Sequence, residues 1–187
     1  MRYLSMRLLA LAGALLLGLG ALGPARTTNA SAALTRMDQL ESEIGRYRAA
    51  TWRWQALMRK PRTPSNFSER EAGSAAYLDW VRDLWLVRAR RAERQAENPP
   101  HRDGWLCIHR FERNPLQGWS THTGNGYYGG LQMDISFQRT YGAELLRRKG
   151  TANNWSAIEQ MWVAERAHRS GLGFYPWPNT ARSCGLI

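Results

Sequence analysis

The chain has 187 residues, of which 43% are hydrophobic, and its formal net charge is +11. This length has room for one ordinary domain with an accessory element. The excess of Lys and Arg favours polyanionic partners, such as nucleic acid, acidic lipid or the acidic polymers of a bacterial wall. Charge alone does not choose among these three.

Residues 1–32 have the pattern of a secretory signal peptide. Arg2 and Arg7 precede an apolar run at residues 8–22, and a small-x-small motif follows at residues 30–32, which matches a charged n-region, an h-region and a cleavage site. The run is shorter than the roughly 20 residues that a membrane-spanning helix needs. We therefore expect export to the cell wall or medium, without stable membrane insertion after cleavage; an uncleaved N-terminal anchor is the alternative.

Residues 34–100 are predicted to form an antiparallel helical hairpin. Apolar residues recur every three or four positions over residues 34–58 and again over residues 74–97, as on one face of an amphipathic helix. Pro61 and Pro64 end the first helix. Two helices joined by a short Pro-containing linker favour an antiparallel pair. The basic end of the second helix is interpreted either as a solvated helix end or as a polyanion site.

Residues 103–187 are predicted to form a mainly helical domain. The expected helices are residues 103–112, a helix that starts after Asp134 or Ser136 and runs to about residue 149, and a helix that opens with a capping box at Ser156 and ends at Gly171. The glycine-rich loop, residues 112–133, allows at most a short β-hairpin. Residues 173–179 have no regular period.

The two cysteines, Cys107 and Cys184, are the only pair in the chain. Outside the cytosol, two lone cysteines usually form one disulfide, so we expect a bridge between the start and the end of the domain. A nucleophilic Cys107 activated by His109 is the alternative. Side chains two positions apart on a helix point away from one another, which disfavours it.

Glu112 lies at the start of a loop whose residue types resemble those of a sugar-binding surface. It is the only carboxylate between Asp103 and Asp134, and a carboxyl group partly removed from water can protonate the leaving oxygen of a glycosidic bond. The alternative is a surface Glu paired with Arg110 or Arg113. Aromatic rings can stack on sugar rings and polar side chains can bind hydroxyl and N-acetyl groups, and the candidates here are Trp119, Thr123, Asn125, Tyr127, Tyr128 and Gln132.

The segment TGNGYYGGLQ, residues 123–132, resembles the signature of the resuscitation-promoting-factor domain, a transglycosylase-like branch of the lysozyme superfamily. The resemblance covers roughly residues 105–187 and includes the two cysteines, Trp119, the Ala-Glu-Arg of residues 164–166 and the Pro-Trp-Pro of the tail. The predicted hairpin has no counterpart in that domain.

The resemblance implies a lysozyme-like fold, an actinobacterial secreted protein and cleavage of the β-1,4 glycan strands of peptidoglycan. It implies that Glu112 is the catalytic acid/base, that Cys107 and Cys184 form the disulfide, and that the loop lines the glycan groove; it implies no metal or cofactor. Anionic wall polymers are further candidate partners and nucleic acid is not expected. In the family the acid usually follows the first Cys directly, whereas here it lies about one helical turn later. A second departure is Ser136-Phe137, where the family tends to have a Ser/Thr pair followed by Trp.

Two other classes of function remain open on the sequence. A protein that keeps the groove but cleaves weakly or not at all would be a glycan-binding wall protein. A protein whose charge is its whole function would be a structural or polyanion-binding protein. For an enzyme with a single acid, either a muramic-acid hydroxyl or a water molecule can supply the nucleophile.

Overall fold

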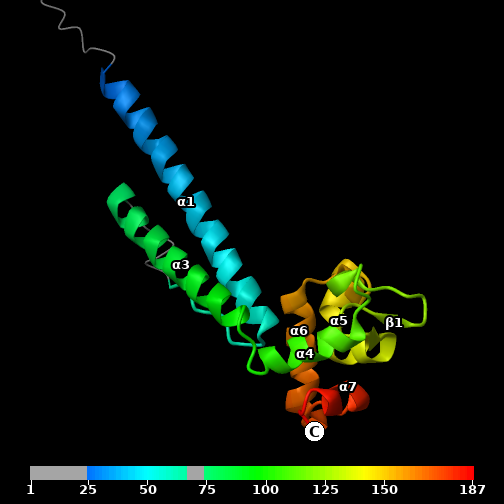
Figure 1. Cartoon of the computed structure of the whole chain (residues 1–187). Coiled ribbons are helices and arrows are strands. Elements are labelled where there is room, and N and C mark those ends of the chain that lie inside the picture. Colours follow the sequence, from blue (N-terminus) through cyan, green and yellow to red (C-terminus); the bar gives the residue numbers. More distant parts are fainter. Residues whose placement is uncertain (1–24, 67–73) are drawn as a thin grey trace, which may run out of the picture.

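The computed structural model describes residues 25–66 and 74–187, and it shows a long helix pair attached to a compact helical lobe (Figure 1). The elements in chain order are α1 (Ala25–Leu57), α3 (Ala75–Ala96), α4 (Arg102–Glu112), the 3-10 helix η1 (Gly118–Ser120), β1 (Tyr127–Tyr128), β2 (Met133–Asp134), α5 (Ile135–Lys149), the 3-10 helix η2 (Ala152–Asn154), α6 (Ala157–Ala167), the π-helix η3 (His168–Leu172) and α7 (Pro178–Ser183).

The lobe has the mainly α, lysozyme-like architecture that the sequence predicts. Its only sheet within the described residues is a two-stranded antiparallel one, in which Tyr127 pairs with Asp134 and Tyr128 pairs with Met133. This short hairpin closes the glycine-rich loop, as expected. The loop is therefore anchored at its end by the start of α5.

The helix pair forms as predicted, but its antiparallel orientation is wrong. Arg36 of α1 bonds Asp79 near the start of α3, at 2.8 Å, while Lys60, just beyond α1, bonds Gln95 near the end of α3, at 3.0 Å. Contacts that advance together along both helices define a parallel pair. Figure 1 shows both helices descending toward the lobe.

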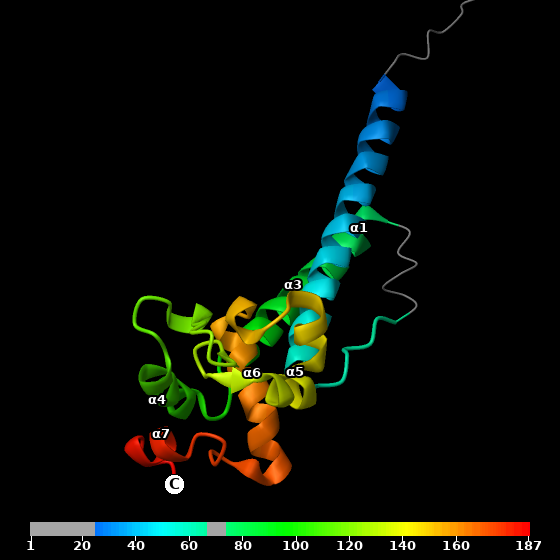
Figure 2. The same ribbon diagram turned by 90° about the vertical axis from the view of Figure 1, so that its right-hand side faces the viewer.

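The parallel pairing is possible because the chain after α1 turns back along that helix. Trp52 Nε1 donates to the carbonyl oxygen of Thr63 at 2.9 Å, and the Arg48 guanidinium donates to Ser65 Oγ at 3.2 Å. Figure 2 shows this return segment rising beside α1. An extended chain advances about 3.3 Å per residue against 1.5 Å in a helix, so the few residues after α1, up to residue 66, can run back along several turns of that helix. Pro61 and Pro64 therefore start an extended return and not a tight turn.

The predicted signal peptide falls mostly outside the described residues. Its charged start and its apolar run, residues 8–22, are not described, whereas α1 begins at Ala25 and includes residues 30–32. No helix in the described part of the chain is long and apolar enough to cross a membrane.

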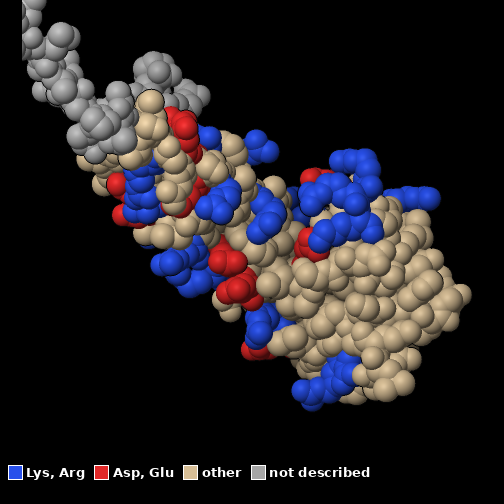
Figure 3. Space-filling view, turned by 90° about the horizontal axis from the view of Figure 1, so that it is seen from above, with Lys and Arg blue, Asp and Glu red and all other residues tan. Residues whose placement is uncertain are grey.

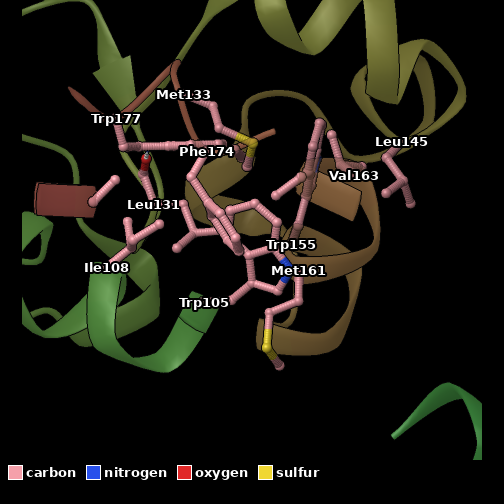
Figure 4. Close-up of a cluster of buried hydrophobic side chains, with 13 residues drawn as sticks. Trp105, Ile108, Leu131, Met133, Leu145, Trp155, Met161, Val163, Phe174 and Trp177 are labelled. Carbon is pink, nitrogen blue, oxygen red and sulfur yellow. Dashed lines mark hydrogen bonds between the residues drawn. The ribbon is translucent and has the colours of Figure 1, made fainter. Parts of the chain in front are cut away.

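The lobe is built around α6, most of whose side chains are buried. Figure 4 shows the surrounding cluster, in which α4 contributes Trp105 and Ile108 and the C-terminal segment contributes Phe174 and Trp177. Trp177 Nε1 also donates to the carbonyl oxygen of Leu131, at 2.6 Å. Burial of such large side chains stabilises by about 1.5–3 kcal/mol each, and this cluster packs α4 and the segment that leads into α7 against the end of the glycine-rich loop.

The ends of the lobe helices follow the sequence signals. Asp134 caps α5 by accepting a hydrogen bond from Phe137 N at 2.7 Å, and Ser156 and Glu159 form the predicted capping box of α6. The helix that the sequence continues to Gly171 ends as an α-helix at Ala167 and continues as η3. Helix α7 was not predicted; it begins with Pro178, which a first helical turn tolerates.

Trp162 joins the helix pair to the lobe. It belongs to α6, is 4% exposed, and packs with Met58 and Ala96 at the lobe end of the pair. Its Nε1 donates to the carbonyl oxygen of Ala96 at 2.7 Å. The two parts of the molecule are therefore joined by a buried contact.

We expect Trp162→Phe to lower the free energy of unfolding by about 1–3 kcal/mol, because it leaves the buried Ala96 carbonyl without its donor. Urea unfolding followed by circular dichroism measures the change. Trp80→Phe is the matched control, since Trp80 is 54% exposed and its replacement should cost less than about 0.5 kcal/mol. Equal effects of the two substitutions would contradict the proposed junction.

Candidate active site

Glu112 is the last residue of α4 and lies half-buried between this helix and α7. Its Oε1 accepts a hydrogen bond of 2.9 Å from Thr180 Oγ1, in α7. The alternative interpretation, an ion pair with Arg110 or Arg113, is not seen among the described residues; Arg113 donates instead to the carbonyl oxygen of Pro115. The candidate acid thus has a neutral hydroxyl as its hydrogen-bond partner.

The disulfide explains how α4 and α7 come together. Cys107 and Cys184 are bonded, with their Cα atoms 6.0 Å apart, as the sequence predicts. Cys107 lies in α4 and Cys184 caps the end of α7. A nucleophilic Cys107 is excluded in this state, because its sulfur is already bonded.

His109 has a role that the sequence analysis did not identify. Its ring stacks on Trp119, with centroids 3.8 Å apart and planes 8° from parallel, and its Nδ1 lies 3.0 Å from the carbonyl oxygen of Gly130. One turn of α4 therefore holds both ends of the glycine-rich loop. Trp119 is half-buried, with one face covered by His109.

The other predicted ligand-binding residues divide into exposed and supported ones. Thr123, Asn125 and Tyr127 are exposed on the loop, and Asn125 Oδ1 accepts from Tyr127 N at 3.1 Å. Tyr128 is half-buried and stacks on His122, with centroids 5.1 Å apart. Gln132 has a φ of 49° and donates to the Gly129 carbonyl at 2.8 Å. Thr123, Asn125 and Tyr127 are therefore available to a ligand from solvent. Tyr128 and Gln132 are held in place by contacts within the loop.

Two of the loop glycines are required by packing. A Cβ atom on Gly130 would overlap the rings of His109 and Trp119, and one on Gly129 would overlap the side chain of Gln160. Gln160 is fully buried and donates to the carbonyl oxygens of Trp119 and Ala152. Close packing within the lobe therefore requires glycine at both positions.

The other conspicuous carboxylate of the lobe, Glu165, has a structural role. It is fully buried in α6 and accepts hydrogen bonds from Trp105 Nε1 at 2.8 Å and from His101 N at 2.9 Å. Asp134 is committed to the cap of α5. Of these three carboxylates, Glu112 alone has no backbone hydrogen bond in the described structure, since its partner is the Thr180 hydroxyl.

The environment of His109 makes the loop sensitive to acid. Burial, opposed by the Gly130 hydrogen bond and reinforced by the positive charge of Arg113, lowers the pKa of His109 below its ordinary value of 6.5. The unfolded chain then binds more protons than the folded one just below that value. The contribution of neutral His109 to the free energy of unfolding is complete above pH 6.5. It is lost as the pH falls through the lower pKa that His109 has in the folded state.

We expect His109→Gln to reduce the loss of thermal stability between about pH 7.5 and about pH 5.5, because Gln keeps a donor for Gly130 but does not titrate. Thermal unfolding at the two pH values measures this. His168, whose pKa burial also lowers, is unchanged in the variant, so the difference reports His109 alone. A pH dependence identical to that of the wild type would contradict the assignment.

Comparison with known proteins defines the class of this lobe. Residues 110–180 match the family model of the transglycosylase-like domain. The matched segment contains Glu112, the whole glycine-rich loop and Thr180, and it leaves out both cysteines and the helix pair.

The relatives are resuscitation-promoting factors. The chain is 44% identical over 64 residues to resuscitation-promoting factor RpfE of Mycobacterium tuberculosis and 38% identical over 68 residues to a resuscitation-promoting factor of Corynebacterium glutamicum. These segments are 34% and 36% of this chain and 34% of each relative, so the chain spans about a third of the length of these relatives. No solved structure matches the chain.

Proposed function

We propose that this protein is a secreted enzyme that cleaves the β-1,4 glycan strands of peptidoglycan, with Glu112 as its single acid/base. The observation that carries the proposal is the position of Glu112: it lies within the matched transglycosylase-like segment, at the end of α4 and beside the glycine-rich loop. The exposed Tyr127 and the polar residues Thr123 and Asn125 would contact the sugar rings.

Thr180 supports both protonation states that such a reaction needs. A hydroxyl has one hydrogen and two lone pairs. When Glu112 is ionised, Thr180 Oγ1 donates to it at 2.9 Å; when Glu112 is protonated, Thr180 can accept from it and donate instead to the carbonyl oxygen of Trp177, 3.3 Å away. The carboxyl group therefore keeps a hydrogen bond as acid and as base.

In the proposed reaction Glu112 first gives its proton to the glycosidic oxygen as the bond to the anomeric carbon breaks. The 6-hydroxyl of the muramic acid, or a water molecule, then attacks that carbon. Its proton returns to the Glu112 carboxylate, so the enzyme is restored. Attack by the sugar hydroxyl gives an anhydro end, and attack by water gives a reducing end.

Export and domain division belong to the same proposal. The division of the chain into three parts remains a prediction. These parts are a signal at residues 1–32, a helix pair at residues 34–100 and a catalytic part at residues 103–187. The disulfide fits an oxidising compartment. A cell-wall location would also suit the excess of basic residues, because wall polymers are acidic.

Mass spectrometry of the soluble products from purified peptidoglycan tests the proposal. We expect disaccharide fragments, and the mass of their ends distinguishes an anhydro product from a hydrolytic one. Binding to the insoluble wall without soluble fragments would instead identify a non-catalytic or weakly catalytic glycan-binding protein. Equal binding to nucleic acid and wall would contradict both functions.

A further inference from the structure

A hollow lies between the helix pair and the lobe, on residues that belong to neither α4, α7 nor the glycine-rich loop. Its volume is about 700 Å³, within the roughly 300–1,000 Å³ range of small-ligand sites, which often lie at domain boundaries. One wall is the last part of α1 with the return segment, and the other is formed by α5 and α6. We call it the interlobe cleft; the side chains used below are Trp52, Arg53, Trp54, Arg62, Arg148 and Arg166.

The interlobe cleft has an excess of positive charge that the protein does not neutralise. It is lined by four Arg, one Lys and two Glu. Glu144 pairs with Arg148 at 3.1 Å and Glu159 pairs with Lys149 at 2.7 Å. Both carboxylates are thereby used, and within residues 31–66 and 74–187 no carboxylate pairs with the three remaining guanidinium groups, those of Arg53, Arg62 and Arg166.

The surface view agrees with this distribution. Lys and Arg side chains gather over the helix pair and over the adjoining part of the lobe, whereas the far end of the lobe carries almost none on the visible face (Figure 3). An anion that approaches this face is therefore attracted toward the junction of the two parts.

Arg166 places an uncompensated cation in the wall of the cleft. Its guanidinium donates to the carbonyl oxygens of Tyr141 and Leu57, both at 2.7 Å, and its buried Nε has no partner in the described structure. Burial, followed by the charge of Arg59, lowers the pKa of Arg166 to about 10. An anion in the cleft would offset this desolvation.

The wall formed by α1 adds flat apolar surface to these cations. Arg62 lies over the ring of Trp52 at 5.4 Å from its centroid, and Arg53 lies over the ring of Trp54 at 5.0 Å. A guanidinium held against an aromatic face is oriented and keeps its donors for a carboxylate. The lining also includes Ala49, Ala56, Leu57 and Leu145, which suit an aliphatic ligand.

We propose that the interlobe cleft binds a short peptide that carries a free carboxylate and aliphatic side chains, the chemistry of the peptide part of a bacterial wall. The guanidinium groups recognise the carboxylate, and the tryptophans and small apolar residues contact the aliphatic part. A uniformly charged polyanion fits less well, because it has no aliphatic groups to contact the tryptophans and the small apolar residues of the lining. The biological meaning rests on the proposed function, since the peptide would hold the wall while Glu112 acts on its glycan.

The experiment is calorimetric titration of the full chain carrying Glu112→Gln, so that cleavage does not disturb binding. The probes are the tetrapeptide released from purified peptidoglycan, the same peptide with its carboxyl groups converted to amides, and inorganic polyphosphate. We expect the free-acid peptide to bind and Arg53→Gln with Arg62→Gln to weaken it about 10- to 100-fold, as expected for lost charge-assisted hydrogen bonds. Amidation should weaken binding to a similar degree.

The matched control is Arg46→Gln with Arg90→Gln, two exposed arginines of the helix pair outside the cleft, which should leave the affinity unchanged. Circular dichroism confirms that both double variants are folded. Equal binding of the amidated peptide, tighter binding of polyphosphate, or an equal loss in the control would overturn the proposal. The titration does not depend on turnover, so a failure of the cleft and a failure of the proposed glycan cleavage are distinguished.

Discussion

Glu112→Gln is expected to lower the rate of glycan cleavage by about 10²–10⁴-fold, the usual contribution of general acid–base catalysis. Gln preserves the size of the side chain, and its amide oxygen can still accept the hydrogen bond from Thr180. It cannot deliver a proton to the leaving oxygen. Release of soluble fragments from purified peptidoglycan measures the loss, and sedimentation with insoluble wall should show that binding is retained.

Asp134→Asn is the matched control for this experiment. Asp134 caps α5 through its hydrogen bond to Phe137 N, and Asn is as good a cap as Asp. We expect a stability change of about 1 kcal/mol or less and wild-type cleavage. Full activity in the Glu112 variant combined with a loss in the Asp134 variant would show that the wrong carboxylate has been assigned.

Local signals in the sequence predicted the lobe helices well. Asp134, Ser156 and Gly150 mark helix ends by side-chain caps or by positive φ, and the structure places helix ends at all three. These signals act within one turn of the chain, so a single sequence contains them. Helix α7 has only Pro178 as a local start signal, and it was missed because the helix is short and is held in place by the disulfide and by Trp177.

The relative direction of α1 and α3 could not be read in the same way. Both orientations bury the same apolar stripes, and the choice depends on where the connection runs. Thr63 and Ser65 fix the return segment along α1 through bonds to Trp52 and Arg48, and these pairs are separated by more than ten residues. A short linker was inferred from Pro61 and Pro64, yet prolines are equally compatible with an extended segment.

The candidate site shows the same division between local and distant information. Glu112 and the loop were found because they are close in sequence and carry distinctive residue types. Thr180 and His109 were missed as site residues: Thr180 lies 68 positions after Glu112, and His109 was considered only as a partner of Cys107. A His two residues beyond a Cys on a helix points elsewhere, and here it points to Trp119.

Removal of the disulfide is expected to have the largest effect on stability. The bridge closes a loop with a sequence separation of 77, for which the chain-entropy model gives about 4–5 kcal/mol, within the 2–5 kcal/mol usually measured for native bridges. Cys107→Ala with Cys184→Ala should therefore lower the free energy of unfolding by about 2–5 kcal/mol in urea denaturation. We expect the same bonded pair in protein exported to an oxidising compartment, so intact-mass analysis that finds two free thiols there would contradict the bridge.

Activity should fall together with stability, because the bridge holds α7, and with it Thr180, against the end of α4 that carries Glu112. A small displacement of a catalytic group can cost as much as about 10²-fold in rate. Cleavage measured at a temperature where the double variant is still folded separates this effect from unfolding. If the folded double variant cleaves at the wild-type rate, the bridge stabilises the lobe without positioning the acid, and the packing of Trp177 alone must hold Thr180 beside Glu112.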